Sequence, residues 1–429
     1  MPSIRPFKGI VYNAKRFKDL SRLVSPPYDV ISKIMQNELY RKSPYNIVRL
    51  ILRNSKKENS VKENRYARAA GNFKSWIKKN ILIQDKSPAL YIYSQEYTYG
   101  QKKIERIGFM GRMSFNGSGE KKSVLPHENT LMLPKLDRLN LLRAVRANLE
   151  PIFVLYQDEG HKVVDILKEF RSDAAPFIDT DFENVRHRMW RLQNRRIISK
   201  VGSVVGSKEI FIADGHHRYE SSRTYSIEIQ GKRTPQRLKN SSKFIMAYFA
   251  EFNDYTLTIL PSHRLIKDIG ILKKRDIISK IEAFFYIEKT SYEDAPILKP
   301  RASKELSVFG MYLGKGDFYI LKLKDHGIVD RLIRNYSEEW RRLDVAVLHL
   351  LLIQYVLRIR DDDDNVEFIK DQDEAVRLVD CGKYNIAFIL NPTSLSQVAR
   401  IAKLGERMPR KATYFYPKPL SGLVINKLD

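Results

Sequence analysis

The sequence predicts an α/β fold (α+β, with mixed sheets), because short apolar stretches typical of strands alternate with segments of helical spacing through most of its 429 residues. The alternation is clearest where apolar runs at 151–156, 210–213 and 243–249 are separated by segments of helical character. A hydrophobic content of 43%, with 23 Tyr and 20 Phe, supports a sizeable core. The length fits about two or three domains of usual size.

In the first part of the chain, prolines before residue 50 favour extended segments and turns. The apolar stripe Tyr66, Ala69, Phe73 and Trp76 predicts a core-facing helix over 65–78. Residues 89–115 predict a β-hairpin that turns at Gly100. The segment 116–123 lacks the Gly-Lys-Ser/Thr end of a Walker loop and is interpreted as a connection. Arginines at helical spacing predict a basic helix over about 186–200.

A second alternation follows residue 250. Apolar segments predict strands at 256–260 and 385–390, a hairpin formed by 307–312 and 318–323, and helices at 343–357 and 394–404. The acidic run Asp361–Asp364 lacks the glycine of a calcium loop and is interpreted as a solvated turn. These patterns predict a Pro-rich and helical segment at 1–85, a core at 86–250 and a C-terminal α/β domain at 251–429 that contributes to the substrate site.

Composition limits the classes of function. The net charge of +26 raises nucleic acid as a partner, but the charge is spread along the chain, so this partner is not favoured. The single cysteine, Cys381, excludes an internal disulfide framework and a cysteine-rich zinc site. No apolar run has the length of a membrane span, and the first residues lack a signal-peptide pattern. We therefore expect a cytoplasmic protein that does not bind membranes.

The most informative segment is Glu209–Glu220. The apolar run Ile210–Ala213 predicts a buried strand, Asp214 and Gly215 predict a turn, and helical spacing begins at His216. A helix that begins after a glycine turn offers backbone N–H groups and a positive dipole end to an anion. His216, His217 and Arg218 add donors, and Asp214 is a candidate helix cap or metal ligand. The predicted ligand is a polyphosphate; the alternative is an ordinary strand-turn-helix unit with solvated histidines.

Glu128, in the sequence Pro126-His-Glu, is the candidate general base. Phosphoryl transfer needs a hydroxyl nucleophile, a base and positive charge on the moving phosphate. His216, His217 and Arg218 are candidates for that charge, with Mg²⁺ bound to the nucleotide. Adjacent histidines point apart on a helix, so no direct protein metal site is predicted apart from the possible role of Asp214. The alternative for Glu128 is an N-cap or ion-pair carboxylate.

Ordered motifs along nearly the whole chain identify it as a member of the prokaryotic domain-of-unknown-function family number 1015. The motifs are Arg5-Pro-Phe-Lys-Gly9, Pro26-Pro-Tyr-Asp-Val30, Ser43-Pro-Tyr-Asn46, Leu125-Pro-His-Glu128, Lys135-Leu-Asp-Arg138, Ala213-Asp-Gly-His-His-Arg-Tyr-Glu220, Leu260-Pro-Ser-His-Arg264, Asn391-Pro-Thr393 and Met408-Pro-Arg-Lys-Ala-Thr-Tyr-Phe415. The family name itself implies no activity.

Pro-His-Glu followed by Asp-Gly-His-His-Arg also resembles, more distantly, the archaeal free-serine kinase, which has the ParB/sulfiredoxin-like fold. The resemblance implies a nucleotide-binding core of this fold with large insertions, with Glu128 as base and Asp214–Arg218 on the nucleotide phosphates. It places Lys411 and Thr413 near the substrate, and His127 and Arg264 are further candidates for substrate contact. The chain departs from the kinase in the 86 residues that separate Glu128 from Asp214, and in Ala412, where the kinase has Thr.

Three functions are therefore consistent with the sequence. The first is a kinase that phosphorylates a hydroxylated metabolite, with free L-serine giving O-phosphoserine as the leading case. The second is a ParB-like nucleotide-binding regulator associated with DNA, although no helix-turn-helix is visible after the 209–220 segment. The third is an enzyme of other chemistry that uses the loop to bind a phosphorylated substrate.

Overall fold

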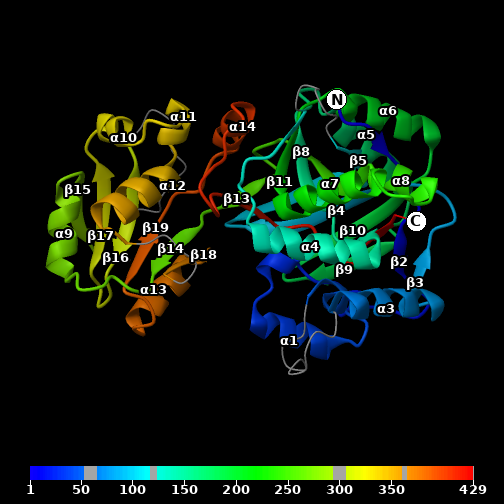
Figure 1. The fold of residues 1–429 in the computed structure, drawn as a ribbon, viewed down its shortest axis with the longest axis horizontal. Helices are drawn as coiled ribbons and strands as arrows, with labels where there is room; N and C mark the ends of the chain where they lie inside the picture. The colour runs from blue at the N-terminus through cyan, green and yellow to red at the C-terminus, as the bar shows by residue number, and fades with distance from the viewer. Residues whose placement is uncertain (53–64, 116–122, 293–305, 360–364, 429) are drawn as a thin grey trace. The chain divides into compact units, whose positions relative to one another are not determined.

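The computed structural model describes residues 1–52, 65–115, 123–292, 306–359 and 365–428 (Figure 1). These residues form two compact units. The first contains Met1–Pro126, Thr130–Leu257 and Pro417–Asp429, and the second contains His127–Asn129 and Thr258–Tyr416. Sheets and helices alternate in both, which confirms the predicted mixed α/β class. The acidic run 361–364 and all but the last residue of the predicted connection at 116–123 lie outside the described residues.

The first unit is built on a nine-stranded mixed sheet of order β6-β11-β8-β12-β5-β4-β10-β9, with β1 paired to β5. β12 runs parallel to β8 and antiparallel to β5, whereas β11 runs parallel to β6 and antiparallel to β8. The predicted hairpin is confirmed as β4 and β5. The strands are β1 (Ile4–Arg5), β4 (Leu90–Tyr99), β5 (Lys102–Ser114), β6 (Val124–Leu125), β8 (Ile152–Tyr156), β9 (Ile178–Phe182), β10 (Val185–Leu192), β11 (Ile210–Asp214) and β12 (Phe244–Glu251).

Helices α5 (Lys162–Ser172) and α6 (Arg195–Gly206) cover one face of this sheet (Figure 1). Alternate residues of the strands, such as Ile152 and Val154, face Val163 and Val201 because side chains on a strand point to opposite faces in turn. Helices α4 (Met132–Val145), α7 (His216–Gln230) and α8 (Gln236–Ser242) form a separate apolar cluster with Leu428.

The first 85 residues pack into the same unit. Their core is formed by the predicted stripe of α3 (Arg65–Lys78), where Ala69, Phe73 and Trp76 are buried against residues of α4. Around it lie η1 (Tyr28–Val30), α1 (Lys33–Lys42), α2 (Val48–Ile51) and two two-stranded sheets. One sheet pairs β2 (Ile10–Tyr12) with β3 (Leu82–Gln84), and the other pairs β7 (Ala147–Asn148) with β21 (Asn426–Lys427).

The second unit has a six-stranded sheet of order β15-β17-β16-β19-β14-β18 and a two-stranded sheet of β13 and β20. The strands are β13 (Thr258–Leu260), β14 (His263–Ile266), β15 (Phe285–Thr290), β16 (Val308–Tyr312), β17 (Phe318–Leu323), β18 (Val366–Ile369), β19 (Ile386–Ile389) and β20 (Tyr414–Tyr416). The helices are α9 (Lys274–Glu282), α10 (His326–Leu332), α11 (Glu338–Arg341), α12 (Asp344–Ala346), α13 (Gln372–Asp380) and α14 (Leu395–Lys403). The buried helix predicted at 343–357 is confirmed, with Val347–Val356 (η3) in the wider π-helical form.

The predicted basic helix at 186–200 is wrong. Residues 185–192 form strand β10, in which Val185, His187 and Met189 alternate inward, and α6 begins only at Arg195 after the cap residue Asn194. The strand arginines are paired within the protein: Arg186 binds Asp179 at 2.7 Å, and Arg191 binds Asp85 at 2.8 Å. The arginines of β10 are therefore neutralised within the protein, whereas the other basic residues of the segment, Arg195, Arg196 and Lys200, lie on α6 and are exposed.

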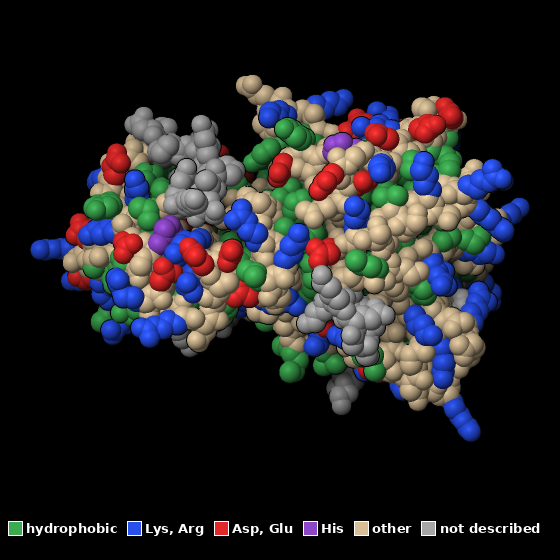
Figure 2. All heavy atoms as spheres, turned by 90° about the horizontal axis from the view of Figure 1, so that it is seen from above, with side chains coloured by type: hydrophobic (Ala, Val, Ile, Leu, Met, Phe, Trp, Pro, Cys, Tyr) green, Lys and Arg blue, Asp and Glu red, His purple; other side chains and the backbone are tan. Residues whose placement is uncertain are grey.

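The remaining charge is dispersed, as expected. On the face drawn in Figure 2, Lys and Arg side chains lie at many separate points with Asp and Glu among them. Within the described part of the chain, no helix combines the length and the apolar character needed to cross a membrane.

Candidate functional site

The Glu209–Glu220 segment folds as its sequence predicts. Strand β11 ends at Asp214, Gly215 adopts φ +91°, and α7 begins at His216. A glycine is needed here because a Cβ would lie 3.0 Å from both Arg218 and Ile152, at a φ that other residues rarely adopt. Gly215 also has no side chain to cap the helix, so no N-cap side chain offsets the positive end of the α7 dipole.

The carboxylate of Asp214 is held between two cations. One oxygen pairs with the Arg218 guanidinium at 2.5 Å, and the other pairs with the Lys418 ammonium, which also reaches Asp29 at 2.8 Å. All three groups at the centre are buried, with Asp214 9% exposed and Arg218 7% exposed. Because both oxygens of Asp214 are engaged, its structural role in this arrangement is to fix the loop.

Arg218 also faces inward. Its guanidinium donates to the carbonyl of Pro151 as well as to Asp214. Burial lowers the pKa of Arg218, but the nearby carboxylates of Asp214, Glu150 and Asp29 outweigh that effect and raise the pKa overall. Arg218 therefore keeps its positive charge, and its guanidinium lies on the buried side of the loop, against Pro151 and Asp214.

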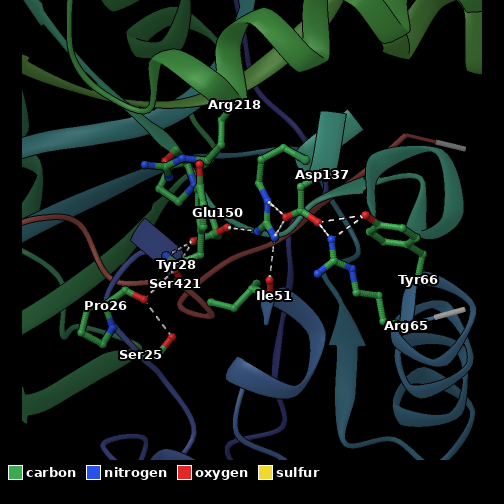
Figure 3. A network of polar contacts seen from close by, with 12 residues as sticks. Ser25, Pro26, Tyr28, Ile51, Arg65, Tyr66, Asp137, Glu150, Arg218 and Ser421 are labelled. Atoms are coloured by element: carbon green, nitrogen blue, oxygen red, sulfur yellow. Dashed lines mark hydrogen bonds and ion pairs between the residues drawn. The ribbon is translucent and has the colours of Figure 1, made fainter. Parts of the chain in front are cut away.

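A wider polar network supports this loop (Figure 3). Glu150 accepts from the Tyr28 backbone at 3.0 Å and from the Ser421 hydroxyl at 3.0 Å, and lies 3.6 Å from Arg138. Asp137 then joins Arg138 to Arg65 and accepts from the Tyr66 hydroxyl at 2.9 Å. The family motifs around residues 26–30, 135–138 and 213–220 therefore meet in one buried set of ion pairs.

The two histidines of the loop differ. His216 is buried, with 5% of its surface exposed. His217 is partly exposed, and its Nε2 accepts a hydrogen bond of 3.0 Å from the Leu131 backbone N–H. In that arrangement the proton of a neutral His217 sits on Nδ1, because Nε2 uses its lone pair as an acceptor.

The other predicted site residues lie in the second unit. His127 is fully buried, and its Nε2 lies 3.0 Å from the Thr413 hydroxyl. The backbone of this segment pairs with the late motif, since Met408 N–H donates to the His127 carbonyl at 2.8 Å and Glu128 forms a parallel bridge with Met408. The structure thus brings the Pro-His-Glu motif beside a motif about 280 residues later.

Arg264 and Thr393 hold the late motif in place. The Arg264 guanidinium, which is completely buried, donates to His349 Nε2 at 2.8 Å and to the carbonyls of Arg410 and Lys411 at 3.2 Å. The Thr393 hydroxyl donates to the Ala412 carbonyl at 2.9 Å. Lys411 itself has φ +53°, so its backbone is fixed in the left-handed region. Arg264 therefore positions the segment 410–412 through its backbone.

The predicted residues thus form two groups. Asp214–Arg218 belong to the first unit, and His127, Glu128, Arg264, Lys411 and Thr413 belong to the second. Three residues of the loop's surroundings, Tyr28, Glu150 and Lys418, were missed by sequence reasoning. Among the described residues, no group of three or more His, Cys, Asp or Glu side chains is arranged to hold a metal ion.

Comparison with protein families now decides the relationship. The family model described as a protein of unknown function, DUF1015, matches residues 4–346, which is more than half of the chain. The chain belongs to this family. The matched DUF1015 span includes the motifs from Arg5 to Arg264, and the late motif at 408–415 lies beyond it. No curated protein matches the chain.

Several solved structures are distantly similar. A conserved hypothetical protein from Pyrococcus furiosus is 13% identical over 71% of this chain and 92% of its own, with a TM-score of 0.35. A free serine kinase mutant in complex with AMP is 11% identical over 68% and 84%, with a TM-score of 0.34. C-terminally truncated SbnI from Staphylococcus aureus is 12% identical over 70% and 82%, with a TM-score of 0.33. Identities and TM-scores this low carry no argument about activity.

Proposed function

We propose that this protein is a small-molecule kinase. It transfers a phosphoryl group from ATP or ADP to a hydroxylated metabolite, with free L-serine as the first candidate and O-phosphoserine as its product. The proposal assigns the nucleotide phosphates to Asp214–Arg218, general-base catalysis to Glu128, and acceptor binding to Lys411 and Thr413.

The observation that carries the proposal is the fixed start of α7. Gly215 at φ +91° leads the chain into the first helical turn without a capping side chain, and helix N-termini bind phosphate through their backbone N–H groups. The Asp214 carboxylate, which would repel phosphate, is neutralised by Arg218 and Lys418. His216 and His217 follow directly at the helix start, and the proposal assigns them the role of donors to the transferring phosphate.

The acceptor side is supported by the pairing of His127 with Thr413. This contact and the Glu128–Met408 backbone bridge hold the Pro-His-Glu segment beside a segment whose backbone accepts hydrogen bonds from Arg264. Fixed groups of this kind favour catalysis because little reorganisation is needed when the acceptor binds. Glu128 would accept the hydroxyl proton, and Lys411 would neutralise charge on the acceptor.

The proposed step balances as a simple substitution. The acceptor hydroxyl oxygen forms a bond to the terminal phosphorus, its proton passes to Glu128, and the bond from that phosphorus to the bridging oxygen breaks. ATP then leaves as ADP, or ADP leaves as AMP. Mg²⁺ would accompany the nucleotide and offset the phosphate charge. Because both oxygens of Asp214 are ion-paired, the metal would be held mainly by the nucleotide.

The DNA-associated regulator is not favoured as a second function. Its basis was the resemblance to the ParB/sulfiredoxin-like fold together with the net charge of +26. The basic residues at 186–192 lie on β10, where Arg186 and Arg191 are paired with carboxylates of the same unit. Arginines engaged in this way contribute less to binding a phosphate backbone.

Phosphorus NMR of the purified protein with Mg²⁺, ATP or ADP, and L-serine tests the proposal. We expect a new phosphoserine signal that is absent for Glu128→Gln, while the nucleotide signals still broaden with that variant. Glu282→Gln is the matched control, because Glu282 is an exposed residue at the end of α9. It should keep full activity.

Three results would change the proposal. If Glu128→Gln also loses nucleotide binding, Glu128 is not the base. If wild-type protein broadens the nucleotide signals without producing phosphoserine, the acceptor is another alcohol and a panel of hydroxylated metabolites replaces serine. If neither nucleotide signal changes, the loop does not bind nucleotide and the kinase proposal fails.

A further inference from the structure

The motif Arg5-Pro-Phe-Lys-Gly9 has no part in the proposed function. Its apolar half is an anchor: Phe7 is buried, and a Cβ on Gly9 would lie 2.5 Å from the Tyr91 hydroxyl, so the chain passes closely over β4. Its charged half is different. Arg5 and Lys8 are both exposed, at the start of the large sheet. The motif therefore fixes two cations at one place on the first unit.

These cations line a pocket of about 540 Å³. Five basic residues contribute to it, namely Arg5, Lys8, Arg112, Arg237 and Lys427. Among the described residues that line this pocket there is no Asp or Glu. The pocket has the volume of a small-molecule site and a strongly positive potential.

Two of the arginines face each other directly. Arg5 of β1 is the antiparallel partner of Arg112 of β5, and like charges at such positions repel. Both guanidiniums lie over the ring of Phe244, with their carbons 5.0 Å and 5.5 Å from its centroid. The ring gives each cation a modest attraction but supplies no counter-charge.

Arg112 is incompletely satisfied. Its Nη2 donates to the Pro6 carbonyl at 3.2 Å, but its buried Nε has no hydrogen-bond partner among the described residues. Burial, followed by the charge of Arg5, lowers the pKa of Arg112. Two close guanidiniums, one with an unfilled donor, and no carboxylate among the described lining residues form an arrangement that an anion would complete.

We propose that this pocket is a second binding site, separate from the 214–218 loop, for a small phosphorylated anion whose phosphate is bound by Arg5 and Arg112. Guanidiniums bind phosphate oxygens through paired, charge-assisted hydrogen bonds. Lys8, Arg237 and Lys427 would then bind further anionic groups of the same ligand. The bounded volume favours a small molecule over a nucleic-acid backbone.

Titration calorimetry with inorganic pyrophosphate at low salt tests the site. Arg5→Gln and Arg237→Gln are suitable variants because both residues are exposed and both changes remove one charge. We expect each to weaken binding by about tenfold or more. Arg196→Gln, an exposed arginine of α6 outside the pocket, is the charge-matched control and should bind as the wild type does. Gly215→Ala perturbs the proposed phosphate loop, so any pyrophosphate bound at that loop should be lost in this variant, while the binding that Arg5→Gln weakens should remain.

Thermal unfolding supplies a second measurement that a purely structural arginine would not satisfy. Without anion, Arg5→Gln should unfold at the same or a higher temperature than the wild type, because a repulsive pair is removed. With pyrophosphate, the wild type should gain stability and the variant should gain much less.

The proposal is overturned if the wild type does not bind pyrophosphate, or if Arg5→Gln binds it as tightly as the wild type. Binding lost only in Gly215→Ala would assign the anion to the 214–218 loop instead. A protein that binds duplex DNA but not pyrophosphate, and loses DNA with Arg5→Gln, would make the surface a nucleic-acid contact and refute the small-ligand site.

Discussion

Replacing Asp214 by Asn tests whether ion pairing holds the 214–218 loop. The amide keeps the shape of the carboxylate but removes the charge between Arg218 and Lys418. The side chains of Asp214, Arg218 and Lys418 are 11%, 8% and 8% exposed, so water cannot replace the lost partner well. Breaking a buried pair from one side typically costs about 3–5 kcal/mol, and we expect a loss of unfolding free energy in this range.

The matched control is Asp179→Asn, which removes the partner of Arg186. Those side chains are 38% and 48% exposed, so the expected loss is below about 1 kcal/mol. Urea unfolding followed by tryptophan fluorescence measures both losses. A Trp340→Phe background leaves Trp76 and Trp190, which both report on the first unit. If Asp214→Asn costs no more than Asp179→Asn, the loop does not depend on this ion pair and the reasoning fails.

Further predictions concern single residues. Gly215→Ala should cost about 1–3 kcal/mol and weaken nucleotide binding, whereas Gly100→Ala, with φ +58° and open space around its Cβ, should show only the smaller backbone cost in the same urea assay. Burial lowers the pKa of His187 from 6.5 to about 3. Between these pH values the imidazole is protonated in the unfolded chain but neutral in the folded protein, so the free energy of unfolding should fall as the pH drops from 6.5 towards 3. His187→Gln should flatten that fall, by up to about 1.4 kcal/mol per pH unit, in unfolding measured across this range. Arg264→Lys keeps the charge but loses the guanidinium fork, so limited proteolysis should cut the 410–412 segment faster, and an unchanged cutting rate would argue against the clamp.

Much of the fold could be predicted because its signals are local. The hairpin of β4 and β5, the helix α3 and the β11-turn-α7 unit each have a periodicity that fits one structure and a turn residue at the right place. Strand β10 was predicted wrongly because three arginines at helical spacing were given more weight than the alternation of Val185, His187 and Met189. The burial of that alternating set depends on β4 and β9, which the segment alone does not reveal.

The candidate site was also predictable only in its local part, the loop itself. The motif identified the loop, but not the direction of Arg218, which points to Pro151 and Asp214 inside the protein. Glu150 and Lys418 carry no local signal, since their roles depend on distant partners: Tyr28 and Ser421 for Glu150, and Asp29 and Asp214 for Lys418. A single charged residue outside a motif looks the same in sequence whether it is solvated or buried.

The first unit is built from separate chain segments, so it cannot be completed until the segment that begins at Pro417 has been translated. Residues 417–428 follow the second unit in sequence, yet β21 pairs with β7 and Ile425 bonds to Ile10. Lys418, which completes the charge balance at Asp214, belongs to the same late segment. A ribosome that has already produced all nine strands of the large sheet must still translate Thr258–Tyr416 of the second unit before that lysine appears. Until then the nascent chain has the loop but lacks the cation that completes it.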